Sequence, residues 1–171
     1  MSDTAYLLRA PAGIAGVVSR TLDSTIEPVS ITPVGTTGAP ALFGIACSID
    51  ATTGNLRVVA DPDAGVYGFL AKPYPAIGGG TNAQQGLGTA IPPALGNVDC
   101  MVKGYMSVHM GGTQAAVKGG LVYVWSSASS GTHVQGQVEA ADPATDGFVV
   151  PRSYFMGAAD ANGITEIGFN I

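Results

Sequence analysis

The residues best suited to metal chemistry are His109 and His133, the two histidines of this 171-residue sequence. A metal site in a β protein usually combines two or three histidines with a carboxylate. Here the histidines stand apart in the sequence, and His109 falls on the more polar side of an alternating segment. We interpret both as solvent-facing side chains. A metal site would require the fold to bring the two histidines together in space. We therefore expect no metal and no cofactor.

Nucleophilic catalysis lacks its usual arrangement of residues. No serine or cysteine lies in a G-x-S-x-G turn. The carboxylates Asp61, Asp63, Asp142 and Asp146 stand beside proline or glycine in turn clusters. Aspartate in this setting stabilises a turn through its own side chain. We therefore predict that the protein is not an enzyme.

The two cysteines, Cys47 and Cys100, are far apart in the sequence and lie in apolar surroundings. Neither belongs to a C-x-x-C pair, and no histidine is near enough in sequence to suggest a metal site. Two interpretations stay open, a pair of buried reduced thiols and a disulfide.

Glycine-rich and aromatic segments allow two binding hypotheses. The run GGGTNAQQGLG has the glycines of a phosphate-binding loop, but no GK[ST] follows it, so we interpret it as a flexible loop. Trp125 and Tyr123 either form a stacking platform for a sugar or base or belong to a packed core face. Their alternation with valines favours the core.

Strands must position these side chains, because 25 glycines and 11 prolines leave little room for long helices. Residues 41–60 are predicted to form a hairpin, and Asn162-Gly163 a tight hairpin turn. The predicted fold is all-β, a jelly-roll-like β-sandwich or barrel with long loops and little helix. Alternating apolar residues mark strands in the segments 41–49, 102–110, 121–125 and 165–171.

A chain of this length fits one domain, so residues 1–171 are predicted to form a single β domain. Residues 1–20 are either an N-terminal arm or a first strand. Residues 76–97 show no periodicity and are predicted to form a projecting loop, since irregular segments this long are uncommon unless functional or mobile.

The charge content limits the classes of partner. Seven basic and 12 acidic residues without a basic cluster argue against nucleic acid. No run of about 20 apolar residues predicts a membrane span, and the N-terminus does not resemble a signal peptide. Only 11% of residues are charged, against about 25% in an ordinary soluble domain. A soluble protein this poor in charge either relies on Ser, Thr, Asn and Gln for its surface or covers much of that surface with partners. Of the two, we favour a permanent assembly, because monomers seldom expose large apolar patches.

Five segments, in order, resemble the structural cement proteins that decorate the capsids of tailed bacteriophages. The resemblance covers most of the chain from about Ala10 onward. Its segments are STIEPV (24–29), VYGFLAKPYP (66–75), KGYMSV (103–108), KGGLVYVW (118–125) and FMGAADANGITEIGFNI (155–171).

The resemblance implies a jelly-roll-like domain on the outer surface of a capsid. It also implies that the protein binds as a homodimer or homotrimer over junctions between major capsid protein subunits and reinforces the shell. The expected location is the virion, with the host cytoplasm before assembly. No catalytic residues come with the resemblance.

Apolar side chains outside the clear strands are the predicted intermolecular contacts. They are Tyr6, Leu7 and Leu8 in the N-terminal segment and Tyr74, Ile77, Leu87 and Ile91 in the long loop. Two other functions stay open. One is a carbohydrate-binding β module on a virion, with Trp125, Tyr123 or Tyr74 as the stacking surface, and the other is a cupin-like metal enzyme.

Overall fold

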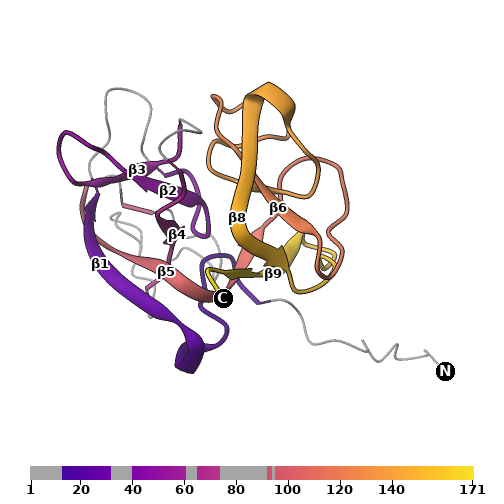
Figure 1. Cartoon of the computed structure of the whole chain (residues 1–171), viewed down its shortest axis with the longest axis horizontal. Helices are drawn as coiled ribbons and strands as arrows, with labels where there is room; N and C mark the ends of the chain where they lie inside the picture. Colours follow the sequence, from indigo (N-terminus) through magenta and orange to yellow (C-terminus); the bar gives the residue numbers. More distant parts are fainter. Residues whose placement is uncertain (1–12, 32–39, 61–64, 74–91, 94) are drawn as a thin grey trace, which may run out of the picture.

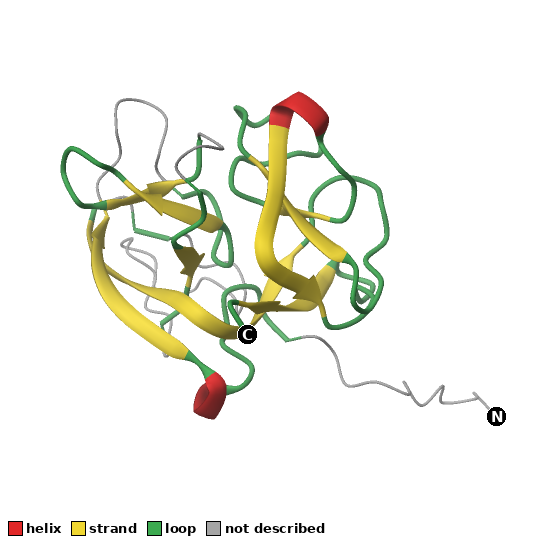
Figure 2. Ribbon diagram, viewed as in Figure 1, coloured by secondary structure: helices red, strands yellow, loops and turns green. Residues whose placement is uncertain are grey.

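The computed structural model describes residues 13–31, 40–60, 65–73, 92–93 and 95–171. Regular structure in these ranges is β, apart from two 3₁₀ turns, η1 (Thr21–Asp23) and η3 (Ala144–Asp146) (Figure 2). The all-β prediction is therefore confirmed. The strands are β1 (Thr25–Ile31), β2 (Ala46–Ile49), β3 (Leu56–Val58), β4 (Gly68–Leu70), β5 (Gly96–His109), β6 (Leu121–Trp125), β7 (Val138–Glu139), β8 (Gly147–Phe155) and β9 (Ile164–Phe169). None of the described segments is a helix long and apolar enough to cross a membrane.

The strands form a closed barrel joined to a second sheet. Their order is β1-β3-β2-β4-β5-β9-β8-β6-β7, and β1 also pairs with β5, which closes the first five strands into a ring. In Figure 1 the barrel strands, purple to magenta, lie beside the orange and yellow strands of the second sheet. The two halves share β5, so no flexible linker separates them.

Strand β5 changes partner at Gly104. Up to Lys103 it pairs with β1, and from Gly104 onward it pairs with β9. Gly104 has a φ of +127°, and a Cβ atom at this position would lie 2.6 Å from Cβ of Ser24. Only glycine fits here without strain, because other residues avoid positive φ and the space is already filled.

The buried apolar side chains form two groups. Ile31, Leu56 and Leu70 fill the barrel interior. A larger group extends across the junction, where the rings of Phe69 in β4 and Phe169 in β9 meet edge to face with centroids 5.2 Å apart. Burial of apolar area therefore stabilises both the barrel and its junction with the second sheet.

The two predicted hairpins are confirmed. β2 and β3 pair antiparallel within residues 41–60, and β8 and β9 pair antiparallel around a turn closed by Gly163 N donating to Asp160 O (3.0 Å). Of Asn162 and Gly163, only the glycine has positive φ, +73°. β8 also continues through Pro151, where its pairing with β6 shifts register.

The predicted segments of irregular chain are described only in part. Residues 13–20 pack on the chain itself, with Val18 bridging antiparallel to Met106 of β5. Gly96 and Asn97, at the end of the predicted projecting loop, belong to β5. Residues 1–12 and 76–91 lie outside the described ranges.

Candidate interaction surface

Residues 13–19 cross the seam between barrel and sheet and are held on both sides by backbone hydrogen bonds. Gly16 N donates to Ser107 O (2.7 Å), and Ser107 N donates to Val17 O (2.9 Å), in the second half of β5. From the barrel, Lys72 N donates to Gly16 O (2.7 Å). The segment is therefore a fixed part of the fold.

Gly16 allows this close approach. Its φ is +85°, and a Cβ atom would lie 2.5 Å from Cβ of Phe43 and 3.1 Å from Cβ of Lys72. Any larger residue would push the segment away from the barrel.

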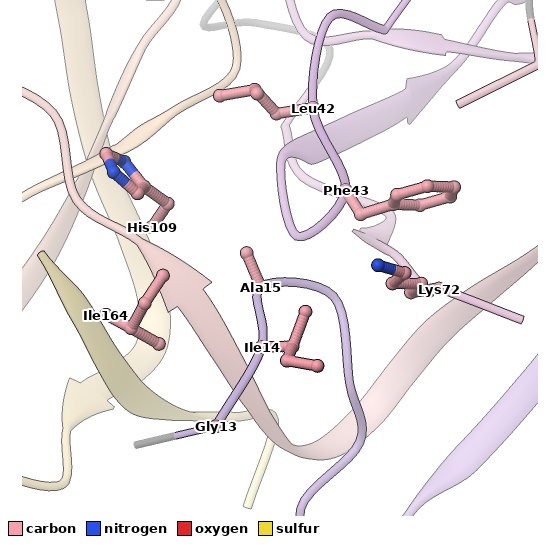
Figure 3. A pocket seen from close by; sticks show the side chains of 8 residues that line it. All are labelled: Gly13, Ile14, Ala15, Leu42, Phe43, Lys72, His109 and Ile164. Atoms are coloured by element: carbon pink, nitrogen blue, oxygen red, sulfur yellow. The ribbon is translucent and has the colours of Figure 1, made fainter. Parts of the chain in front are cut away.

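A pocket of about 260 Å³ opens where residues 13–15 cross the seam. Figure 3 shows Leu42, Phe43 and Lys72 from the barrel on one side, and His109 and Ile164 from the sheet on the other. The described lining is mostly apolar and contains no carboxylate or hydroxyl side chain. Its composition suits an apolar side chain better than a reacting substrate.

A second hollow, of about 420 Å³, lies on the other side of Ile14. Two exposed apolar side chains, Val17 (39% exposed) and Ile26 (44%), line it. Leu22 (99% exposed) directly follows Thr21, another lining residue. We call Ile14, Val17, Leu22, Ile26 and Pro73 the N-terminal surface. The hollow is lined by Ile14, Val17, Val18, Thr21, Ile26, Ala71, Lys72, Pro73 and Asp99.

Arg20 fixes the chain next to this surface. Its guanidinium lies 3.9 Å from the centroid of the Tyr105 ring and 3.0 Å from Oε2 of Glu166. Ser19 Oγ donates to the other carboxylate oxygen of Glu166 (2.6 Å). The hydrogen bond with Glu166 raises the pKa of Arg20 above its usual range.

The predicted contact residues, Tyr6, Leu7, Leu8, Tyr74, Ile77, Leu87 and Ile91, all lie outside the described residues. Sequence reasoning missed Val17, Leu22 and Ile26. One signal was available for Ile26, which shares its side of β1 with the exposed residues Pro28 and Ser30. An apolar residue on the polar side of an alternating strand marks a surface that a partner can cover.

The interpretation of Trp125 and Tyr123 as core residues is wrong. Both are half-buried, while Val122 and Val124 between them are fully buried. The valines therefore form the core face of β6, and the aromatic residues lie on its outer face. Trp125 stacks on His133, with ring centroids 4.1 Å apart and planes inclined by 21°.

The two histidines have separate environments. His109 is exposed, as predicted, and its Nδ1 lies 2.8 Å from Nε2 of Gln137. His133 is not simply solvent-facing, because its Nδ1 lies 2.5 Å from Oε1 of Glu139, whose side chain is 4% exposed. In the parts of the chain that the structure describes, no group of three or more His, Cys, Asp or Glu side chains is arranged to hold a metal ion.

The remaining candidates for chemistry have structural environments. Cys47 and Cys100 are free and buried in the barrel, which confirms the interpretation as thiols. Asp142 accepts a hydrogen bond from Ala144 N (2.9 Å), as expected of a turn residue, and Asp146 accepts one from Ser127 Oγ (2.9 Å). Asp61 and Asp63 lie outside the described ranges.

Comparisons with known proteins give a consistent result. The family model described as XM1 gp53 minor capsid protein matches residues 4–169. A solved chain from the structure titled "The capsid of Myoviridae Phage XM1" is 18% identical, has a TM-score of 0.65, and is matched over 99% of this chain and 97% of that chain. A search of curated protein sequences gave no match.

Proposed function

The chain belongs to the XM1 gp53 minor capsid protein family, and from this premise we propose that it binds the outer surface of a tailed-phage capsid and reinforces contacts between major capsid protein subunits. It is a structural component of a virion. Membership of a structural family supports a role without catalysis. We also propose that the protein associates with itself in this role.

The N-terminal surface is the observation that carries the proposal. Leu22 is 99% exposed, and Val17 and Ile26 are also exposed beside an apolar hollow. Burying a leucine side chain stabilises by about 1.5–3 kcal/mol. A partner with apolar side chains would therefore gain affinity here without displacing any part of the core.

Chain connectivity adds support. Gly13 and Pro73, the described residues that adjoin segments 1–12 and 74–91, line the two hollows on either side of Ile14. We propose that Tyr6, Leu7, Leu8, Tyr74, Ile77, Leu87 and Ile91 extend the contact made by the N-terminal surface. A standard stable interface buries about 1,600 Å² in total, and these segments add area that the hollows alone lack.

The surface is also held in place before binding. The hydrogen bonds of Gly16 and the pairing of Arg20 with Glu166 fix the backbone on both sides of Val17. A preorganised surface loses less entropy on binding. On a lattice with many identical sites, even modest contacts of this kind gain strength when copies bind together.

The test uses virions or expanded capsids that lack this protein. Purified protein is added and its occupancy measured by co-sedimentation, with imaging to show which side of the shell gains density. We expect Leu22→Asp to reduce binding by about tenfold or more, because it places a charge in an apolar contact. Leu22→Met keeps an apolar side chain and should bind normally.

Reinforcement is measured separately, by heating capsids with and without bound protein. Occupied capsids should open at a higher temperature, since binding only the intact shell stabilises it. Density on the inner surface of the shell would reject the proposed location. Unchanged binding by Leu22→Asp would reject the proposed surface, and unchanged heat resistance would reject reinforcement.

A further inference from the structure

A second apolar surface lies on the outer side of β6 and β8. Leu121 is 57% exposed, Val149 is 41% exposed, and Val117 in the preceding turn is 64% exposed. Tyr123 pairs directly with Val149, so their side chains share one side of the sheet. We call Val117, Leu121, Tyr123 and Val149 the β6–β8 face.

Charged side chains of opposite sign lie at the two ends of this face. Lys118 lies in the turn before Leu121, which is closed by Gly120 N donating to Val117 O (2.9 Å). Arg152 lies in β8 between Val149 and Tyr154, and Tyr154 pairs with Leu121. Both basic side chains are therefore at the Leu121 end, and both belong to exposed residues.

The acidic end is at Trp125. Trp125 pairs with Gly147, which directly follows Asp146, and Asp142 is exposed in the same turn. The distance from Leu121 to Trp125 is about 13 Å, since each residue of a strand adds about 3.3 Å. Across the described ranges, none of the four charged side chains forms an ion pair.

We propose that two copies of the chain associate through the β6–β8 face about a two-fold axis near the Tyr123–Val149 pair. A two-fold axis places the same patch of each copy against the other in reversed direction. The Lys118 and Arg152 end of one copy then meets the Asp142 and Asp146 end of its partner. The apolar centre of each copy covers that of the other.

The charge arrangement favours a second copy as the occupant. The face has a basic end, an apolar centre and an acidic end. Two copies that face each other in opposite directions bring unlike charges together, whereas two copies in the same direction bring like charges together. Burial of Leu121 and Val149 supplies attraction, and the charges at the rim fix the register. A cyclic trimer would instead need two different complementary patches.

The proposed dimer extends the self-association included in the proposed function, and its test needs no capsid. Molar mass is measured by sedimentation equilibrium over a range of concentrations. We expect a dimer, and we expect Leu121→Asp to weaken it by about tenfold or more. Leu22→Asp, which alters the N-terminal surface, should leave the dimer unchanged.

A charge-swap experiment tests the orientation. One variant carries Lys118→Glu and Arg152→Glu, which makes both ends acidic. The other carries Asp142→Asn, Ala141→Lys and Thr145→Lys, which leaves the acidic end with a net positive charge and retains an oxygen to accept the hydrogen bond from Ala144 N. Each variant alone should dimerise more weakly, and an equimolar mixture should form a heterodimer, which also shows that both variants are folded.

Several results would overturn the proposal. A wild-type chain that stays monomeric at the highest soluble concentration would do so, as would a trimer. A dimer that survives Leu121→Asp would place the contact elsewhere. Failure of the mixed charge variants to associate, with each still folded by circular dichroism, would reject the reversed orientation. Capsid binding could still occur in each case, so the two proposals fail separately.

Discussion

Trp125 and His133 stack with ring centroids 4.1 Å apart, and the same imidazole contacts Oε1 of Glu139 through its Nδ1. The pair covers one face of the Trp125 ring. That face is closed to a sugar, which needs an open aromatic face to stack on.

Replacing His133 tests the role of this cluster. His133→Ala removes the hydrogen-bond partner of the buried Glu139 carboxylate, so we expect the free energy of unfolding to fall by about 1.5–3 kcal/mol. Urea denaturation followed by the fluorescence of Trp125, the single tryptophan, measures the change. The double variant with Glu139→Ala should lose less than the sum of the two single changes.

The exposed His109 provides the matched control. His109→Ala should lower the free energy of unfolding by less than about 1 kcal/mol, because surface substitutions have small effects. If His133→Ala were equally mild, the buried carboxylate would not depend on this imidazole.

A second prediction concerns the position where β5 changes partner. Gly104→Ala must combine a φ of +127° with overlap against Ser24, so we expect it to lower the free energy of unfolding by about 3 kcal/mol or more. Gly54→Ala is the control, since its φ is +71° but no atom lies within 4 Å of the new Cβ. That change should cost about 1–2 kcal/mol. Equal losses would mean that overlap with Ser24 contributes nothing.

Much of the fold followed from two-residue alternation and turn residues. These signals are local, so they located β2, β6, β9 and the final hairpin. They did not predict that β5 is 14 residues long and serves two sheets. That arrangement depends on pairing between β5 and β9, which lie far apart in the sequence, and short-range periodicity carries no information about such partners.

The candidate surfaces show the same limit. Alternation correctly placed Tyr123 and Trp125 on one side of β6, but it did not reveal which side the core covers. Leu22 has no strand pattern to assign it, because η1 is a single short turn. Its exposure is set by how η1 packs beside β5, a tertiary property.

A third prediction concerns stability in acid. Oδ1 of Asp50 accepts hydrogen bonds from Thr53 N (2.8 Å), Thr53 Oγ1 (2.9 Å) and Thr52 N (3.0 Å). These bonds, led by that from Thr53 N, lower the pKa of Asp50 in the folded state. A lowered folded pKa means that the carboxylate stabilises the fold at neutral pH. This contribution is lost as the pH falls below about 4.

Asp50→Asn should therefore be less stable than wild type at neutral pH and should lose less stability on acidification. Urea unfolding between about pH 7 and pH 3 measures both effects. Thr53→Val keeps the backbone donor and removes the hydroxyl donor, so its pH dependence should be intermediate. An unchanged pH dependence in Asp50→Asn would assign the acid sensitivity to other carboxylates.

The last prediction concerns the reactivity of the two thiols. Burial raises the pKa of Cys100 to about 12 and that of Cys47 well above its usual value. Because the thiolate is the nucleophile, both thiols should react slowly with a thiol reagent at about pH 8 while the chain is folded. After unfolding in guanidinium without reductant, two thiols per chain should react at once. Cys47→Ala and Cys100→Ala should each leave one reactive thiol.

Two outcomes would contradict this prediction. A wild-type chain with no reactive thiol after unfolding would contain the disulfide that the sequence left open. Rapid labelling of the folded chain would show that the barrel opens to solvent.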